Sequence, residues 1–275
     1  MALKWIRRIF YSMSIKVNLH AHTFRCGHAK GSEEEYIQRA MQNGIEIMGF
    51  SDHMPFLFPN GYQSGYRVKV EDAKDYIDCL QKLKKKYEGK IDIRIGFEME
   101  YYTDHFKDMF NYAKKLNAEY LILGEHFPSY EDGRFEYAGV PTKNEEALRS
   151  YVDGCIAGIN SGVFTYVAHP DVFNFVGDKE LYSSEMKRLC IAAKNADIPL
   201  EINFLGIRSN RHYPNPLFWQ IAGEVGCNAV YGFDAHSPLP AYDGQSEEAA
   251  KRIIDQNNLT LIEYPKIIDI QGVTL

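Results

Sequence analysis

Short apolar runs alternate with longer stretches of helical periodicity along the chain. The apolar runs that predict strands are 17–20, 45–51, 91–98, 120–124, 164–168, 199–203, 229–233 and 259–262. Between them, apolar residues recur at the spacing of one helix face in the segments 33–43, 71–87, 104–116, 144–160, 184–195, 216–225 and 246–256. Repetition of this kind indicates parallel strands joined by helical crossovers.

Seven or eight strand–helix units predict one closed α/β barrel of the TIM type rather than an open sheet. No segment rich in Pro, Gly or Ser divides the 275-residue chain. We therefore expect a single domain over residues 13–275, preceded by an extension, residues 1–12, to which we assign no function. The longest irregular stretches, 53–70 and 127–143, both follow strands, on the side where barrel loops build active sites.

Composition narrows the functional class. Apolar residues make up 45% of the chain and charged residues 25%, which favours a folded core over disorder. The formal net charge of -6 argues against a surface for duplex nucleic acid. No apolar run approaches the roughly 20 residues of a membrane span, so a membrane partner is not expected. The five cysteines are scattered without a CxxC pair, which predicts reduced thiols and a cytoplasmic protein.

The histidines are concentrated at the predicted strand ends. The chain has nine, and six of them lie at or just past the C-terminal end of a predicted strand: His20, His22, His53, His126, His169 and His236. His28 follows in the loop after the first strand. Glu98 ends the third predicted strand, and Asp234 ends the seventh, two residues before His236. All strand C-termini of a parallel barrel open on one face, so these nine side chains are predicted to meet there.

Taken singly, each of these residues also has an ordinary explanation. A His-x-His pair is more often a surface or core feature than a metal site, and a carboxylate at a strand end often caps the next helix. Their coincidence on one face favours a metal cluster, because packing seven histidines and two carboxylates together gains little stability by itself. Neutral imidazole and carboxylate are suitable ligands for zinc, manganese or iron.

The same residues resemble the ligand motifs of the PHP (polymerase and histidinol phosphatase) superfamily. The motifs that carry the resemblance are HAH at 20–22 with His28, SDH at 51–53, Glu98, His126, HP at 169–170 and DAH at 234–236. The segment NLHAHTFRCGHA at 18–29 is similar in particular to the monofunctional histidinol-phosphate phosphatases. The resemblance runs from the first strand to the last motif and covers most of the chain.

The resemblance implies a distorted (β/α)7 TIM-like barrel that holds three divalent metal ions, of zinc, manganese or iron. The first ion would take His20, His22, Glu98 and Asp234. The second would take His28, His53 and His236. The third would take His126 and His169, with Glu98 bridging to the first. The residues alone indicate the same nine ligands without this grouping.

Such a centre suits the hydrolysis of phosphate esters. Divalent ions cancel the charge of the phosphate and lower the pKa of a bound water to about 7, so we expect attack by a hydroxide that bridges two metals. The catalytic residues are predicted to be Glu98, Asp234 and His236. A guanidinium can grip two phosphate oxygens, and Arg208 is the first candidate for substrate binding, ahead of Arg211 and Arg25.

Several further residues are candidates for supporting roles. Asp52 and Glu201 are predicted to orient metal-bound imidazoles. The aromatic loop 54–66 is interpreted either as a wall of the substrate site or as ordinary loop packing. His212 either contacts the substrate or is a surface histidine.

The predicted activity is hydrolysis of L-histidinol phosphate to L-histidinol and phosphate, a step in histidine biosynthesis. One alternative is a PHP phosphoesterase that acts on another small ester, such as a nucleotide or a sugar phosphate. A 3′–5′ exonuclease is disfavoured by the acidic balance and by the absence of a polymerase body. A tyrosine phosphatase of this superfamily would carry a different opening motif, and a non-catalytic binding module would be expected to have lost ligands. The oligomeric state is not predicted.

Overall fold

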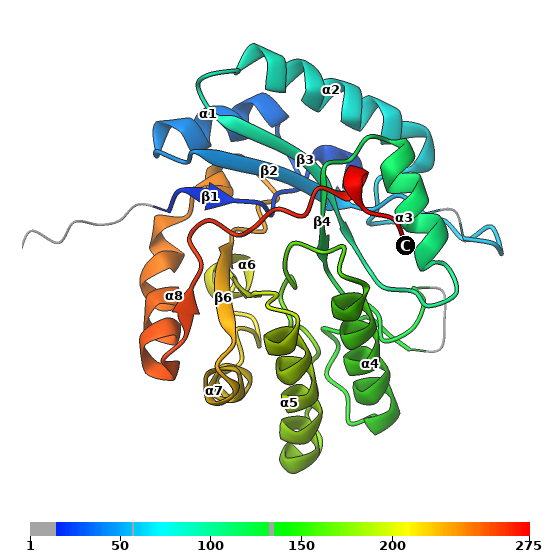
Figure 1. Ribbon diagram of the computed structural model, residues 1–275, viewed down its shortest axis with the longest axis vertical. Helices are drawn as coiled ribbons and strands as arrows, with labels where there is room; N and C mark the ends of the chain where they lie inside the picture. The colour runs from blue at the N-terminus through cyan, green and yellow to red at the C-terminus, as the bar shows by residue number, and fades with distance from the viewer. Residues whose placement is uncertain (1–14, 57, 132–134) are drawn as a thin grey trace, which may run out of the picture.

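The computed structural model describes residues 15–56, 58–131 and 135–275, and Figure 1 shows their arrangement. Parallel strands form a curled sheet, and helices cover its outer side. The predicted extension, residues 1–12, lies outside the described residues.

The strands pair in parallel in two groups. The first group follows chain order and consists of β1 (Val17–Asn18), β2 (Ile47–His53), β3 (Asp92–Met99) and β4 (Tyr120–Leu123). The second group also follows chain order and consists of β5 (Leu200–Asn203), β6 (Asn228–Gly232) and β7 (Thr260–Leu261). All seven coincide with predicted apolar runs.

Isolated bridges close the two groups into a distorted barrel. The predicted strand 164–168 contributes Val167, which pairs in parallel with both Leu123 of β4 and Leu200 of β5. On the opposite side, Ala21 just after β1 pairs in parallel with Ala235 just after β6. The predicted single-domain TIM-like α/β barrel is therefore confirmed.

Helices fill the crossovers between strands. They are α1 (Glu33–Gln42), α2 (Ala73–Lys86), α3 (Phe106–Lys115), α4 (Glu145–Ser161), α5 (Lys179–Asn195), α6 (Phe204–Arg208), α7 (Pro216–Val225) and α8 (Gly244–Asn257). Figure 1 shows α1, α2 and α3 on one side of the barrel and α4, α5, α7 and α8 on the other. The sequence did not predict α6, because five residues are too few to display a helical period.

Local sequence signals set several helix ends. Ser32 and Glu35 form a reciprocal capping box at the start of α1. Asn215 caps α7, Pro216 occupies its first turn, and Gly226 ends it in a left-handed conformation. These ends fix where each helix leaves the loop that precedes it.

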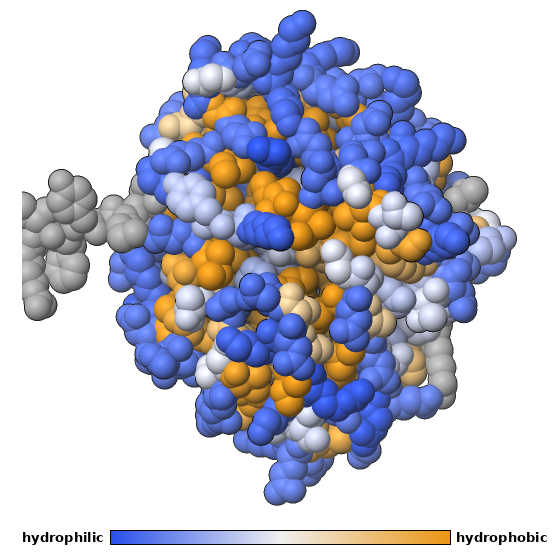
Figure 2. All heavy atoms as spheres, in the orientation of Figure 1, coloured by the Kyte–Doolittle hydropathy of each residue, from blue (hydrophilic) through white to orange (hydrophobic). Residues whose placement is uncertain are grey.

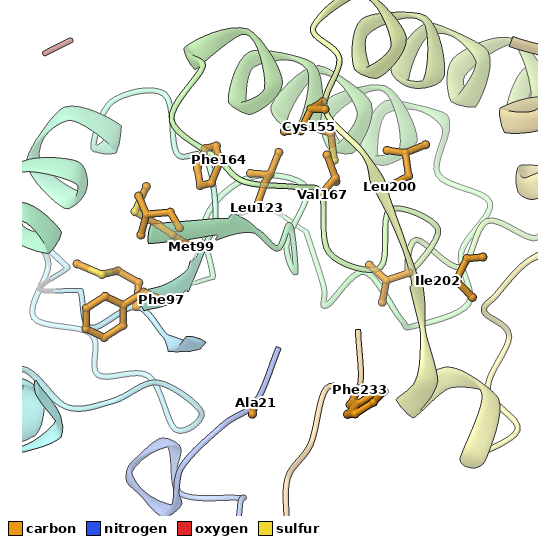
Figure 3. Packing of buried hydrophobic residues seen from close by; sticks show 14 of the residues in the cluster. Ala21, Phe97, Met99, Leu123, Cys155, Phe164, Val167, Leu200, Ile202 and Phe233 are labelled. Carbon is orange, nitrogen blue, oxygen red and sulfur yellow. The ribbon is translucent and has the colours of Figure 1, made fainter. Parts of the chain in front are cut away.

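The hydrophobic core has an outer and an inner part. The outer part lies between the sheet and its helices, and Figure 3 shows Phe97 and Met99 of β3, Leu123 of β4 and Ile202 of β5 within it. The inner part fills the barrel and consists of Val17, Leu19, Tyr120, Ile122, Tyr166, Ala168 and Val230. Alternation along β4 explains the division, since successive side chains of a strand point to opposite faces.

The C-terminal segment crosses the barrel at the end where the strands begin. The N–H of Ile270 donates to the carbonyl of Glu119, just before β4, and the N–H of Ile268 donates to the Thr165 hydroxyl. Figure 1 shows this segment running from β7 towards α3. In the same orientation, Figure 2 shows hydrophilic residues over the outer helices and hydrophobic residues nearer the middle of the face. The C-terminal segment thus covers the end of the barrel where the strands begin, and a site can form only from the loops at the other end, where the strands finish.

Gly49 is predicted to be required for the packing of the barrel interior. The Tyr120 hydroxyl donates to the Leu19 carbonyl at 2.7 Å, and a Cβ atom on Gly49 would lie 2.2 Å from that hydroxyl and 2.9 Å from Leu19 Cα. Gly49→Ala should therefore lower the free energy of unfolding by about 1–3 kcal/mol, measured by urea denaturation. Gly65→Ala is the control, because its added Cβ meets nothing within 4 Å. Equal stability of the two variants would contradict this account.

Candidate metal centre

The parallel strands deliver the predicted ligands to one mouth of the barrel. His53 ends β2 and is the registered neighbour of Glu98 in β3. His20 and His22 lie in the segment after β1, which ends at Asn18, and Asp234 lies in the segment after β6, which ends at Gly232. The bridge between Ala21 and Ala235 holds these last two segments side by side.

The first ligand group is compact. The Nε2 atom of His22 lies 3.2 Å from Asp234 Oδ1 and 3.6 Å from Glu98 Oε2. The Nε2 atom of His20 lies 3.5 Å from Glu98 Oε2 and 3.7 Å from Asp234 Oδ1. Four side chains from three strands thus surround one small volume, as the resemblance implied for the first ion.

The other ligands lie on either side of Glu98. His28 and His236 bring their Nε2 atoms to 2.9 Å from each other, and His53 Nδ1 lies 3.1 Å from Glu98 Oε2. On the other side, Glu98 Oε1 lies 2.8 Å from His169 Nε2 and 3.4 Å from His126 Nε2. All nine predicted ligands are therefore brought together, with the Glu98 carboxylate between the groups.

The residues fit divalent metal ions, as their unpartnered polar atoms show. The buried atoms that have no hydrogen-bond partner include His20 Nε2, His22 Nε2, His53 Nδ1, Glu98 Oε2 and Asp234 Oδ1. A buried polar atom without a partner is costly, and five of them facing one another would not persist for stability alone. Imidazole nitrogens and carboxylate oxygens converging in this way form the donor set that zinc, manganese and iron accept.

Carboxylates behind the histidines fix the orientation of the rings. The Nδ1 atom of His20 donates to Glu201 Oε1 at 2.7 Å, and Nδ1 of His126 donates to Glu100 Oε1 at 2.9 Å. Such bonds leave Nε2 free to bind an ion. The sequence predicted this role for Glu201 but missed it for Glu100. The missed signal was its spacing of two from Glu98, which places both side chains on one side of the extended chain at the end of β3.

Asp52 orients the His22 ring in the same way, and hydrogen bonds in turn fix the Asp52 carboxylate. Its Oδ1 atom lies 3.4 Å from His22 Nδ1, and its Oδ2 atom accepts hydrogen bonds from the backbone N–H and the hydroxyl of Thr23. Asn203 donates to both Glu201 and Asp234 through its amide nitrogen. The ligand-bearing loops are therefore joined by hydrogen bonds beneath the site.

Backbone features make room for the carboxylates. A Cβ atom on Gly232 would lie 1.6 Å from Glu201 Oε1, and one on Gly124 would lie 2.1 Å from Glu98 Oε1. His169 and Asp234 adopt positive φ angles of 29° and 47°, which cost about 1–3 kcal/mol each for residues other than glycine. Strained backbone at two ligand positions is typical of a functional site.

Burial and neighbouring charges shift the pKa values of the groups in the centre in opposite directions. Burial by itself lowers the pKa of His22, but Asp234 and Asp52 outweigh it and raise that pKa to about 9. Burial raises the pKa of Glu98, and His126 and His20 outweigh it and hold that pKa well below its usual value. The buried carboxylates of the centre thus favour positive charge beside them. Divalent ions supply such charge and would neutralise the same carboxylates.

A cavity of about 560 Å³ opens above the ligands. Seven of the candidate ligands line it, with His28 and His236 at the rim and five others on the floor: His53, Glu98, His126, His169 and Asp234. Its walls include the aromatic side chains Tyr66, Phe127, Tyr137 and Tyr213. Of the predicted aromatic loop, Tyr66 therefore does form part of a wall.

The three candidate arginines have different surroundings. Arg211 lines the cavity and donates to the Tyr213 hydroxyl at 2.9 Å. Arg208 instead donates to the carbonyl oxygens of Phe233 and Asp234, and the structure does not place it in the cavity lining. Arg25 is paired with Glu33 and Asp75. Only Arg211 of the three is thus brought to the ligands, while Arg208 supports the backbone that carries Asp234.

His212 lies outside this cavity lining. Its Nε2 atom donates to the carbonyl of Val172 at 2.7 Å, which ties the loop after α6 to the loop that follows His169. This contact favours a structural role over contact with a substrate.

Comparison with known proteins identifies the family. A family profile described as the PHP domain matches residues 18–204. This chain belongs to the PHP family. The PHP chain is 29% identical over 227 residues to the "Probable histidinol-phosphatase" of Deinococcus radiodurans, covering 80% of this chain and 85% of that protein. It is also 29% identical over 116 residues to the histidinol-phosphatase of Bacillus subtilis, covering 39% of this chain and 42% of that one.

A solved structure shares the fold of the PHP chain. The histidinol phosphate phosphatase of Lactococcus lactis, complexed with zinc, L-histidinol and phosphate, superposes with a TM-score of 0.70. The match covers 95% of this chain and 99% of that one at 18% identity. The described helices of the PHP chain include none that is both long enough and apolar enough to cross a membrane.

His236→Ala is predicted to lower the divalent metal content and the turnover while leaving the barrel folded. His236 contacts both His28 and Asp234, so its loss should weaken ion binding by more than the roughly 10–100-fold typical of losing a partner behind a ligand. Elemental analysis of dialysed protein and circular dichroism would measure the two effects. His105→Ala is the matched control, because His105 contacts Phe56 and Tyr130 away from the ligands. Parental metal content in His236→Ala would remove this residue from the ligand set.

Proposed function

We propose that this PHP protein is a metal-dependent phosphomonoesterase that hydrolyses L-histidinol phosphate to L-histidinol and phosphate. The observation that carries the proposal is the convergence of nine candidate ligand side chains, several with unpartnered buried atoms. Seven of the nine line a cavity that Arg211 also lines. The named relatives support the choice of substrate, and so does the bound histidinol in the Lactococcus structure of the same fold.

We propose three divalent ions per chain, of zinc, manganese or iron. The unpartnered atoms and the distances support the three groups that meet at Glu98, which has one oxygen towards His169 and the other towards His22 and His53. When bound, such ions neutralise the phosphate dianion and lower the pKa of a coordinated water to about 7. Within this site Glu98 joins the three groups.

Asp234 is our candidate to receive the proton of the attacking water. Its Oδ1 atom is buried without a hydrogen-bond partner and lies 3.2 Å from both His22 Nε2 and His236 Nδ1. His236 stands at the rim of the cavity and fixes Asp234 from the solvent side. The phosphorus–oxygen bond to the leaving alkoxide breaks as the new bond to the water oxygen forms. The alkoxide takes up, directly or through solvent, the proton that Asp234 received, and it leaves as histidinol.

We propose that Arg211 binds the phosphate group of the substrate. Its guanidinium lies beside the Tyr213 hydroxyl in the cavity wall, and a guanidinium can donate two hydrogen bonds to one phosphate. Tyr66, Phe127 and Tyr137 offer aromatic faces to the imidazole ring and to the cationic amine of histidinol. We place the enzyme in the cytoplasm, as its scattered free thiols suggest.

A substrate panel tests the proposed reaction. Metal-loaded protein should release phosphate from L-histidinol phosphate with a kcat/KM well above that for nucleoside monophosphates and sugar phosphates, and should not degrade single-stranded DNA. Removal of the ions by a chelator should abolish the release, and manganese, zinc or iron should restore it. A preference for a nucleotide or a sugar phosphate would show that the proposed substrate is wrong and that the proposed reaction type is right. Inactivity on every ester would overturn both.

Arg211→Met is predicted to lower kcat/KM for L-histidinol phosphate by roughly 10–150-fold. The estimate follows from about 1.5–3 kcal/mol for a hydrogen bond to a charged group. Metal content should stay at the parental level, because Arg211 donates its hydrogen bond to Tyr213, which is not a proposed ligand. Arg188→Met is the control, since Arg188 lies on α5 and pairs with Asp153 and Glu185. An unchanged kcat/KM in Arg211→Met would exclude this arginine from substrate binding.

A further inference from the structure

Arg67 is a buried arginine whose five N–H groups all have acceptors. Its side chain is 2% exposed. Nε donates to Glu131 Oε2 at 2.8 Å, and Nη1 donates to Glu100 Oε2 at 2.7 Å and to the Met54 carbonyl at 3.2 Å. Nη2 donates to the hydroxyls of Tyr66 at 2.7 Å and Tyr102 at 3.1 Å. A guanidinium so completely bonded and so deeply buried fixes the groups around it in one arrangement.

The acceptors of Arg67 come from separate parts of the site. Met54 and Tyr66 belong to the loop after β2, Glu100 follows β3, and Glu131 belongs to the loop after β4. These are the loops that supply Tyr66 and Phe127 to the cavity wall. Arg67 therefore joins the two long loops of the barrel mouth to the end of a central strand.

Glu100 connects this arginine to the metal centre. Its Oε1 atom accepts from His126 Nδ1 at 2.9 Å and from the Tyr66 hydroxyl at 2.8 Å, while its Oε2 atom accepts from Arg67. The Glu100 carboxylate is buried, so loss of the Arg67 guanidinium would remove a full positive charge that is paired with it. Tyr66 also packs edge-on against the ligand His53, with ring centroids 4.9 Å apart. Displacement of Arg67 would thus release both the His126 ring and a wall of the cavity.

We propose that Arg67 is a positioning residue that sets the His126 imidazole, through Glu100, for the ion held by His126 and His169. The proposal rests on the proposed function, since it assigns Arg67 a part in ion binding at that site. His20 and His22 are oriented by Glu201 and Asp52, which receive no hydrogen bond from Arg67. Loss of Arg67 should therefore affect one ion before the other two.

Arg67→Met tests this dependence, with Arg67→Lys and Arg94→Met beside it. Arg67→Met removes all five donors, and Arg67→Lys keeps the charge but has three donors on a different stem. Arg94→Met is the matched control, because Arg94 also pairs with a carboxylate of β3, Asp92, at the opposite end of that strand. Each variant is loaded with manganese, dialysed against increasing chelator, and analysed for ions per chain. Anomalous diffraction then identifies which ion is lost.

Arg67→Met is expected to lose the ion at His126 and His169 at chelator concentrations about 10–100-fold below those needed for the parent protein, as for other partners behind metal ligands. Excess manganese should restore the kcat of Arg67→Met. The chelator concentration at which the ion is lost should lie between those of Arg67→Met and the parent for Arg67→Lys, and should equal that of the parent for Arg94→Met. Equal loss of all ions, or parental retention with the fold intact, would overturn the proposal. A general weakening of the fold would not be confined to one ion.

Tyr66→Phe covers the case in which Arg67→Met does not fold. It removes one acceptor of Arg67 and one donor to Glu100 but leaves the guanidinium buried. A smaller but selective loss of the same ion is expected, and unchanged ion retention would count against the proposal. Counting ions needs no substrate, so a parent protein that binds its ions but does not hydrolyse L-histidinol phosphate would overturn the substrate assignment alone.

Discussion

One buried carboxylate organises the whole barrel mouth. Glu98 is 1% exposed, and its two oxygens lie within 3.6 Å of nitrogen atoms on five histidines. A buried charge at such a position is tolerated only if opposite charges or ions surround it. The ends of β1, β2 and β4 and the segment after Val167 must therefore converge on β3, and the curled parallel sheet is the arrangement that lets them do so.

The interior below the centre is shaped by small residues placed opposite large ones. Glycines at 49 and 96 give space to Tyr120, and glycines at 124 and 232 give space to Glu98 and Glu201. The inner cluster is thus apolar at the level of Tyr120 and polar at the level of the carboxylates. This change from apolar to polar along the barrel axis lets one continuous fold support both a packed core and a cluster of buried charges.

Support for the ligands comes from behind and from the side. Glu201, Asp52 and Glu100 each hold the Nδ1 edge of one histidine, and each also accepts a hydrogen bond from a group of another segment. Arg208 and Arg67 extend this support to the loops after β6 and β2. Arg211 is different, since it lines the cavity and remains available to a bound anion. Fixed supporting side chains together with one arginine in the cavity lining suit a site that holds ions and admits a phosphate ester.

The sequence by itself determined the barrel and the convergence of the candidate ligands. Apolar runs of strand length alternate with helical periods, and parallel strands place all their C-terminal ends on one face, so His20, His126 and Asp234 had to meet there. It did not determine the supporting side chains: α6 was too short to recognise, Arg208 was expected at the substrate, and Glu100 and Arg67 were not considered. Which arginine faces the cavity depends on the direction of each side chain and on acceptors from distant segments, and only the tertiary structure brings those acceptors within hydrogen-bond distance.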